Sequence, residues 1–158
     1  PAKTLVDIGT GSGCLGITAK LELPELDVTL LDISRHALGV AERNAKELQA
    51  NVTIEQSDLL LNYPLQADFI VANLPYVDAS WERSPETSYE PELALFAQNN
   101  GLHLILKLIQ QVPSHLSPKG HLLLEADPRQ HKSLIEAAKA EGLRHLKTDG
   151  FIVALQKN

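Results

Sequence analysis

The sequence predicts an α/β fold with a doubly wound, mostly parallel sheet. Strand-like and helix-like segments alternate along most of the 158 residues, which is typical of a parallel sheet covered by helices on both faces. Residues 143–158 instead read as two short strands around Asp149-Gly150, a dipeptide that favours a hairpin turn. We therefore expect one antiparallel strand at the C-terminal end of the sheet.

Each element in the first half follows from its residues. Residues 4–22 read as a strand, a glycine-rich turn and a helix, and a second strand ends at Asp32. Ser34 is a good N-cap for the next helix, because its hydroxyl can accept a hydrogen bond from an otherwise unpaired N–H. A third strand ends near Asp58, and the short apolar run at 69–72 predicts a buried fourth strand.

The second half begins with an unusually long connection. Residues 77–98 are polar, and a loop longer than about 15 residues in a compact domain is usually functional or disordered. Residues 101–116 predict an apolar-rich helix disturbed late by Pro113, and residues 120–127 predict a fifth strand. The helix expected at 128–142 has proline near its start and glycine at its end, the usual asymmetry.

Composition and charge argue against several classes of protein. No apolar run approaches the roughly 18 residues needed to span a bilayer, and no signal peptide is visible. The missing initiator Met suggests that the numbering starts inside a longer chain. The one cysteine, Cys14, rules out an internal disulfide and fits a reducing compartment, so we expect a cytoplasmic protein. We interpret Cys14 as a core residue at a helix start.

The charged and metal-binding residue types are equally informative. Acidic residues outnumber basic ones by 20 to 14, giving a net charge of -6, which argues against this domain gripping nucleic acid by itself. The six histidines are scattered, and no Cys/His pair has the spacing of a zinc site. No metal site is therefore predicted.

Glycine-rich or polar residues follow four of the expected strands. In sheets of this kind, ligands bind at the carboxyl ends of the strands. The residues at those ends are the turn from Gly9 to Gly13, Asp32, Asp58 and Asn73. Their convergence predicts one ligand-binding crevice.

The segment "DIGTGSGCLG", residues 7–16, is a candidate cofactor turn. Glycines let the backbone turn tightly and approach a ligand closely, and Asp32 has the spacing of a carboxylate that binds both ribose hydroxyls. The same turn also satisfies the dinucleotide fingerprint, so alone it does not separate a nicotinamide cofactor from S-adenosylmethionine. Asp7 favours the latter, because a carboxylate would repel a pyrophosphate but suit a cationic amino-acid group. Asp58 is consistent either with an acceptor for an adenine amino group or with a turn cap.

Several segments that together cover nearly the whole chain follow one another in a characteristic order; they include "LVDIGTGSGCLGI", "DIS..AL..A..NA", "SDLL", "FIVANLPYV", "YEPELAL" and "LSPKGHLLLEADPRQ". In this order they resemble the catalytic domain of the HemK/PrmC family, protein-(glutamine-N5) methyltransferases that modify peptide chain release factors. The resemblance implies the class I S-adenosylmethionine-dependent methyltransferase fold, with a seven-stranded sheet. It also implies that residues 1–158 are the catalytic domain, without the family's N-terminal helical domain that docks the release factor.

The resemblance assigns roles to individual residues. Asp32 would bind the ribose of S-adenosylmethionine, and Asp58 with Leu59 would flank its adenine. Asn73 would lie near the cofactor and, with the three residues after it, would hold the substrate glutamine. The residues that would wrap the methionine part of the cofactor are Gly9, Thr10, Gly11, Ser12 and Gly13.

The tetrapeptide Asn73-Leu74-Pro75-Tyr76 is suited to hold a planar NH2 group. Asn73 Oδ1 and the carbonyl of Leu74 can accept its two protons, and Pro75 fixes the turn. Tyr76 offers a ring face to the planar amide and the nearby cationic methyl. Because adenine and cytosine amino groups would fit as well, the tetrapeptide alone does not identify the acceptor.

Two residues depart from the family pattern. Leu74 stands where the family usually has a first proline, and Leu59 stands where an aromatic residue is often found. Asn-Leu-Pro-Tyr also occurs in ribosomal RNA adenine dimethyltransferases, so a nucleic-acid amino methyltransferase is the alternative; a non-catalytic cofactor-binding subunit is a further one. The segments "YEPELALFAQNNGL" and "LLLEADPRQ" favour the glutamine enzymes. We expect Leu74→Pro to preserve glutamine methylation and, if the Leu74 N–H is unbonded and its φ lies near that of proline, to stabilise the fold by about 0.4–1 kcal/mol through the unfolded state.

Overall fold

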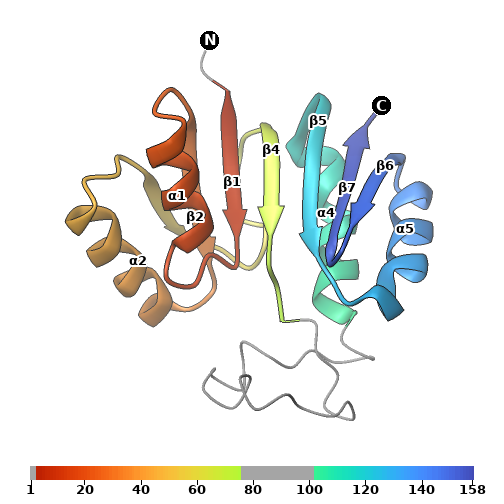
Figure 1. Ribbon diagram of the computed structural model, residues 1–158, viewed down its shortest axis with the longest axis horizontal. Helices are drawn as coiled ribbons and strands as arrows, with labels where there is room; N and C mark the ends of the chain where they lie inside the picture. The colour runs from red at the N-terminus through yellow and green to blue at the C-terminus, as the bar shows by residue number, and fades with distance from the viewer. Residues whose placement is uncertain (1–2, 76–101) are drawn as a thin grey trace.

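One seven-stranded sheet organises the chain, and its strand order is β3-β2-β1-β4-β5-β7-β6 (Figure 1). The structure is a computed structural model that describes residues 3–75 and 102–158. The strands are β1 (Thr4–Ile8), β2 (Asp27–Asp32), β3 (Thr53–Gln56), β4 (Ala67–Ala72), β5 (Leu116–Glu125), β6 (Leu143–Asp149) and β7 (Ile152–Lys157). The helices are α1 (Cys14–Glu22), α2 (Arg35–Glu47), α4 (His103–His115) and α5 (His131–Ala140), with a short 3-10 helix, η2 (Pro128–Gln130), before the last of them.

The direction of the strands confirms the predicted fold class. The neighbouring pairs among β3, β2, β1, β4 and β5 are all parallel, whereas β7 pairs antiparallel with both β5 and β6. The turn between β6 and β7 contains Gly150 at φ 56°, a left-handed conformation that glycine adopts without steric cost. The hairpin expected from Asp149-Gly150 is therefore present.

Two strand boundaries differ from the sequence-based expectation. β3 ends at Gln56, so Asp58 lies in the connection beyond the strand and not at its last residue. β5 begins at Leu116, earlier than the expected residue 120, because Leu116 is fully buried and already pairs with Ala67. The pairing of β4 with β5 shifts register after Ala67. Because no local sequence pattern marks such a shift, the start of β5 was not predicted.

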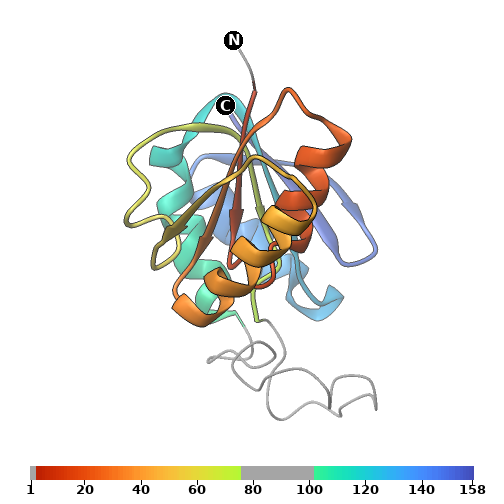
Figure 2. The same ribbon diagram turned by 90° about the vertical axis from the view of Figure 1, so that its left-hand side faces the viewer.

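The sheet is buried on both faces, which explains why its strands read as nearly continuous apolar runs. Neighbouring residues of β1 enter two different core clusters, Val6 and Ile8 the larger one and Leu5 the smaller. α4 and α5 contribute to the larger cluster, and α1 and α2 to the smaller. Figure 2 shows α4 and α1 on opposite sides of the sheet.

Helix α4 is anchored along one side. Its residues Ile105, Leu108, Ile109 and Val112 are at most 1% exposed, at the i, i+3, i+4 and i+7 spacing of a single helical face. Pro113 lies in the last turn of α4 and does not end the helix, which continues to His115. α4 is therefore a fixed support for any loop that it contacts.

Candidate functional site

The glycine turn between β1 and α1 forms a backbone cradle that is open at Gly11. Gly9, Gly11 and Gly13 have φ values of 65°, 57° and 84°, a region that other residues adopt only at a steric cost. A Cβ atom added at Gly11 would meet no other atom within 4 Å. Glycine at this position therefore leaves free space above the backbone, as a closely approaching ligand requires.

Asp7 holds the cradle in shape. Its Oδ2 accepts hydrogen bonds from Thr10 Oγ1 at 2.6 Å and from the Gly16 N–H at 2.9 Å. Burial raises the pKa of Asp7 above its ordinary value of 3.8, the hydrogen bonds from Thr10 and Gly16 oppose this, and the nearby charge of Asp32 adds to it. The carboxyl group thus lies inside the turn at 1% exposure, and the contact with a cationic ligand group stays a prediction.

Asp32 connects the end of β2 to the same turn. Its Oδ2 accepts from the Gly11 N–H at 2.9 Å, and its Oδ1 accepts from the Ser34 N–H at 2.8 Å. Each carboxylate oxygen has a second lone pair, so the group keeps capacity to accept hydrogen bonds from a ligand. Ile33, the next residue, is 65% exposed and places an apolar side chain at the edge where the polar residues gather.

The outer part of the turn is supported from α2. Asn44 Nδ2 donates a hydrogen bond to the carbonyl of Ser12 at 2.9 Å, while Ser12 itself is exposed. Cys14 begins α1 directly after the turn and is exposed. The prediction that Cys14 is a core residue was wrong, because the first two residues of α1, Cys14 and Leu15, are exposed and the buried face of the helix begins at Gly16.

The connection after β3 is tied to α4. Asp58 Oδ2 forms an ion pair with Lys107 Nζ at 2.6 Å, and the Leu60 N–H donates to Gln111 Oε1 at 2.8 Å. Between them, Leu59 has φ 54° and its side chain belongs to the main core cluster. Asp58 is therefore partly engaged within the protein, and the predicted adenine contacts of Asp58 and Leu59 stay predictions.

Leu74, two residues after β4, packs directly on the glycine turn. Asn73 is exposed at the end of the strand, whereas Leu74 is only 4% exposed and lies in the larger core cluster. A Cβ atom added at Gly9 would lie 2.7 Å from Leu74 Cδ2, so glycine at this position makes room for the leucine. Pro75 is half-buried, and Tyr76 lies outside the described residues, as does the long loop expected at 77–98.

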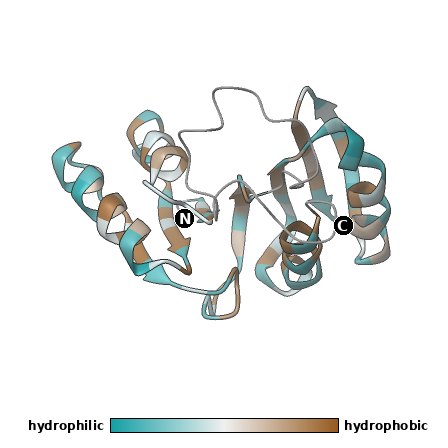
Figure 3. Ribbon diagram, turned by 90° about the horizontal axis from the view of Figure 1, so that it is seen from below, coloured by the Kyte–Doolittle hydropathy of each residue, from teal (hydrophilic) through white to brown (hydrophobic). Residues whose placement is uncertain are grey.

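Sheet pairing brings these segments to one edge. Ile8 pairs with Leu31 of β2 and with Ala72 of β4, so the glycine turn leaves the sheet between Asp32 and Asn73. The Ser57 N–H donates to the carbonyl of Asp32 at 3.0 Å, which places the connection after β3 next to it. Figure 3 looks onto this edge. Sequence reasoning assigned no site role to Ile33, Asn44, Lys107 or Gln111.

In the part of the chain that the structure describes, none of the helices has the length and apolar character that a membrane span requires. Within the same residues, no group of three or more histidine, cysteine, aspartate or glutamate side chains is placed to hold a metal ion.

Comparison with known proteins yields both close sequence relatives and structural neighbours. The chain is 40% identical over 134 residues to a release factor glutamine methyltransferase of Koribacter versatilis, a match that covers 78% of the chain and 48% of that protein. It is 43% identical over 131 residues to a ribosomal protein uL3 glutamine methyltransferase of Xanthomonas campestris, covering 80% of the chain and 42% of the relative. The chain thus spans about half the length of the curated relatives it matches.

The fold comparison agrees with the sequence. A ribosomal protein L11 methylase from Lactobacillus delbrueckii subsp. bulgaricus superimposes with a TM-score of 0.72 at 24% identity, over 100% of this chain and 72% of the other. That likeness supports the class I methyltransferase architecture. The family model described as "Methyltransferase small domain" matches residues 1–87, which contain the glycine turn, Asp32, Asp58 and the Asn-Leu-Pro-Tyr segment. The chain therefore belongs to the methyltransferase small domain family.

Proposed function

We propose that residues 1–158 are the catalytic domain of an enzyme that methylates the side-chain amide nitrogen of a glutamine in a protein, with S-adenosylmethionine as methyl donor. The observation that carries the proposal is the packing of Leu74 on Gly9, which joins the segment suited to an amide acceptor to the candidate cofactor turn. The relatives named as glutamine methyltransferases act on release factors or ribosomal protein uL3. We propose a release factor as the first protein acceptor.

The residues at the edge of the sheet fit S-adenosylmethionine chemically. The free space above Gly11 admits a ligand close to the backbone, and the Asp32 carboxylate can accept hydrogen bonds from ribose hydroxyls. Ile33 offers an exposed apolar surface next to Asp32, and Asp58 offers an acceptor for the adenine amino group. When bound, S-adenosylmethionine supplies a methyl group already activated on its sulfonium.

The tetrapeptide would prepare the acceptor for transfer. A glutamine amide nitrogen is a poor nucleophile because its lone pair is delocalised into the neighbouring carbonyl. Asn73 Oδ1 and the Leu74 carbonyl would accept hydrogen bonds from the two N–H groups of the amide and localise the lone pair on nitrogen. Pro75 would hold both acceptors in place by fixing the turn, and Tyr76 would cover the planar amide with its ring. Positioning alone contributes several kcal/mol to lowering a barrier.

The decisive experiment is methyl transfer from labelled S-adenosylmethionine to a set of acceptors. We expect label in a release factor that carries a Gly-Gly-Gln motif and none in the same factor with that glutamine replaced by alanine. Ribosomal protein uL3, ribosomal RNA and DNA are tested in parallel. Label in RNA or DNA and in neither protein would instead support the nucleic-acid amino methyltransferase. Cofactor binding without transfer to any acceptor would support the non-catalytic subunit.

The role of the glycine turn is tested by Gly11→Ala, with Gly150→Ala as its matched control. Both glycines have nearly the same φ, 57° and 56°, and at both an added Cβ meets nothing within 4 Å. Both variants should therefore lose about 1–2 kcal/mol of unfolding free energy to backbone strain. Only Gly11→Ala should lower the affinity for S-adenosylmethionine in calorimetry, by roughly tenfold or about 1.4 kcal/mol. Equal affinities in the two variants would remove the turn from the cofactor site.

A further inference from the structure

We propose that Lys107 and Gln111 of α4 clamp the connection after β3, and that Lys107 is a positioning residue through which Asp58 distinguishes an adenine from a 6-oxopurine. This inference rests on the proposed use of S-adenosylmethionine. It adds to that proposal a residue from a distant part of the chain that sets the specificity for the cofactor's base.

The two clamp residues are placed to act together. Lys107 and Gln111 are four positions apart in α4, so their side chains leave the same face of the helix. Lys107 Nζ lies 2.6 Å from Asp58 Oδ2, and Gln111 Oε1 accepts from the Leu60 N–H at 2.8 Å. The two contacts flank Leu59, and because the opposite face of α4 is buried in the core, the helix can hold the connection in one place.

The backbone between the two contacts needs such support. Leu59 has φ 54°, a left-handed conformation that an L-residue adopts only at a steric cost. Strained residues of this kind persist only where their surroundings fix them, and they gather at ligand sites. Here the support is a contact on either side of Leu59, together with the burial of its side chain at 8% exposure.

Within the described residues, Oδ1 of Asp58 accepts no hydrogen bond and is open to a ligand. Its side chain is 38% exposed, and among residues 3–75 and 102–158 its one hydrogen bond or ion pair is that with Lys107, made through Oδ2. An ionised carboxylate only accepts hydrogen bonds. Oδ1 can therefore accept from a 6-amino group, whereas the oxygen of a 6-oxopurine would meet a second acceptor. By holding Oδ2, Lys107 fixes where Oδ1 points.

The test compares the affinities of S-adenosylhomocysteine and S-inosylhomocysteine, which differ at position 6 of the purine. Wild-type protein should prefer the adenine compound by roughly 10- to 100-fold, as expected for a hydrogen bond to a charged group. Asp58→Asn should abolish this preference, because an amide can also donate. Lys107→Met should lower it by about two- to fivefold, the range of a partly exposed ion pair, and Lys107→Arg should keep it.

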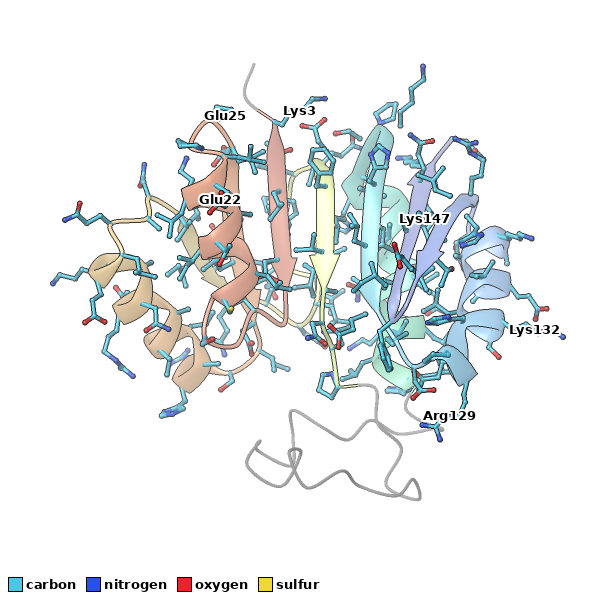
Figure 4. The ribbon with its side chains drawn as sticks, in the orientation of Figure 1. Lys3, Glu22, Glu25, Arg129, Lys132 and Lys147 are labelled. Atoms are coloured by element: carbon cyan, nitrogen blue, oxygen red, sulfur yellow. The ribbon has the colours of Figure 1, made fainter. Side chains whose placement is uncertain are left out.

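The matched control is Lys147→Met. Lys147 forms an ion pair of the same kind with Asp149 at 2.8 Å, but it lies on β6, at the opposite edge of the sheet from β3 (Figure 4). The control variant should keep the wild-type preference, and thermal unfolding should show both methionine variants folded. If Lys107→Met weakens the two compounds equally, Lys107 is structural only and the inference is overturned. If wild-type protein binds neither compound, the proposed function itself fails.

Discussion

Replacing Asn73 with alanine is expected to lower the methyl-transfer rate by about a hundredfold to a thousandfold, the range for loss of one preorganised hydrogen-bonding group. Asn73 is proposed to accept a hydrogen bond from an N–H of the acceptor amide, an interaction that matters most in the transition state. Because its side chain is exposed at the end of β4, the fold should be unaffected. Affinity for S-adenosylmethionine should change only a few-fold.

The measurement is single-turnover transfer to a Gly-Gly-Gln release factor, with cofactor affinity determined separately by calorimetry. Asn62→Ala is the control, since Asn62 is also exposed and its only hydrogen bond within the described ranges is made by the backbone N–H. A rate near that of wild type in Asn73→Ala would refute the amide-clamp mechanism. A loss of cofactor affinity as large as the loss of rate would instead assign Asn73 to cofactor binding.

The sheet was predictable because local patterns decide most of it. Alternating strand-like and helix-like segments predict a parallel sheet covered on both faces, and Asp149-Gly150 predicts the hairpin. The start of β5 was not predictable in the same way. Its first residue, Leu116, is paired with Ala67 before a register shift, and neither the partner nor the shift leaves a local pattern in the sequence.

The candidate site also has a part that could be predicted from local sequence patterns and a part that could not. The glycine turn, Asp32 and Asn73 lie at strand ends as predicted from the sequence, because the carboxyl ends of parallel strands meet at one edge. The contacts by which α4 holds the connection after β3 were not predicted from the sequence. Lys107 is 49 positions from Asp58, and Gln111 is 51 from Leu60, so only the packing of α4 brings them together. Exposure also depends on packing, which is why Cys14 was placed in the core and is exposed.

Leu74 shows how a buried contact changes an expectation formed from the backbone alone. From the sequence, the role predicted for position 74 is to provide a backbone carbonyl, which proline would provide equally well. In the structure, however, the Leu74 side chain is 4% exposed and fills the space left by Gly9. Full burial of a leucine is worth about 1.5–3 kcal/mol, which exceeds the gain of about 0.4–1 kcal/mol that proline brings by restricting the unfolded chain.

Leu74→Pro is therefore expected to lower the unfolding free energy by about 1–2 kcal/mol, the difference between these two effects. Leu74→Ala, which loses the packing and gains no rigidity, should lose more, about 2–5 kcal/mol. Urea denaturation of the two variants and of wild type measures both losses of unfolding free energy.

Below the unfolding transition, Leu74→Pro should still methylate glutamine, because the carbonyl at position 74 is retained. A more stable proline variant would show that the contact with Gly9 contributes little. A folded proline variant that has lost glutamine methylation would mean that leucine serves a different acceptor, which would favour RNA.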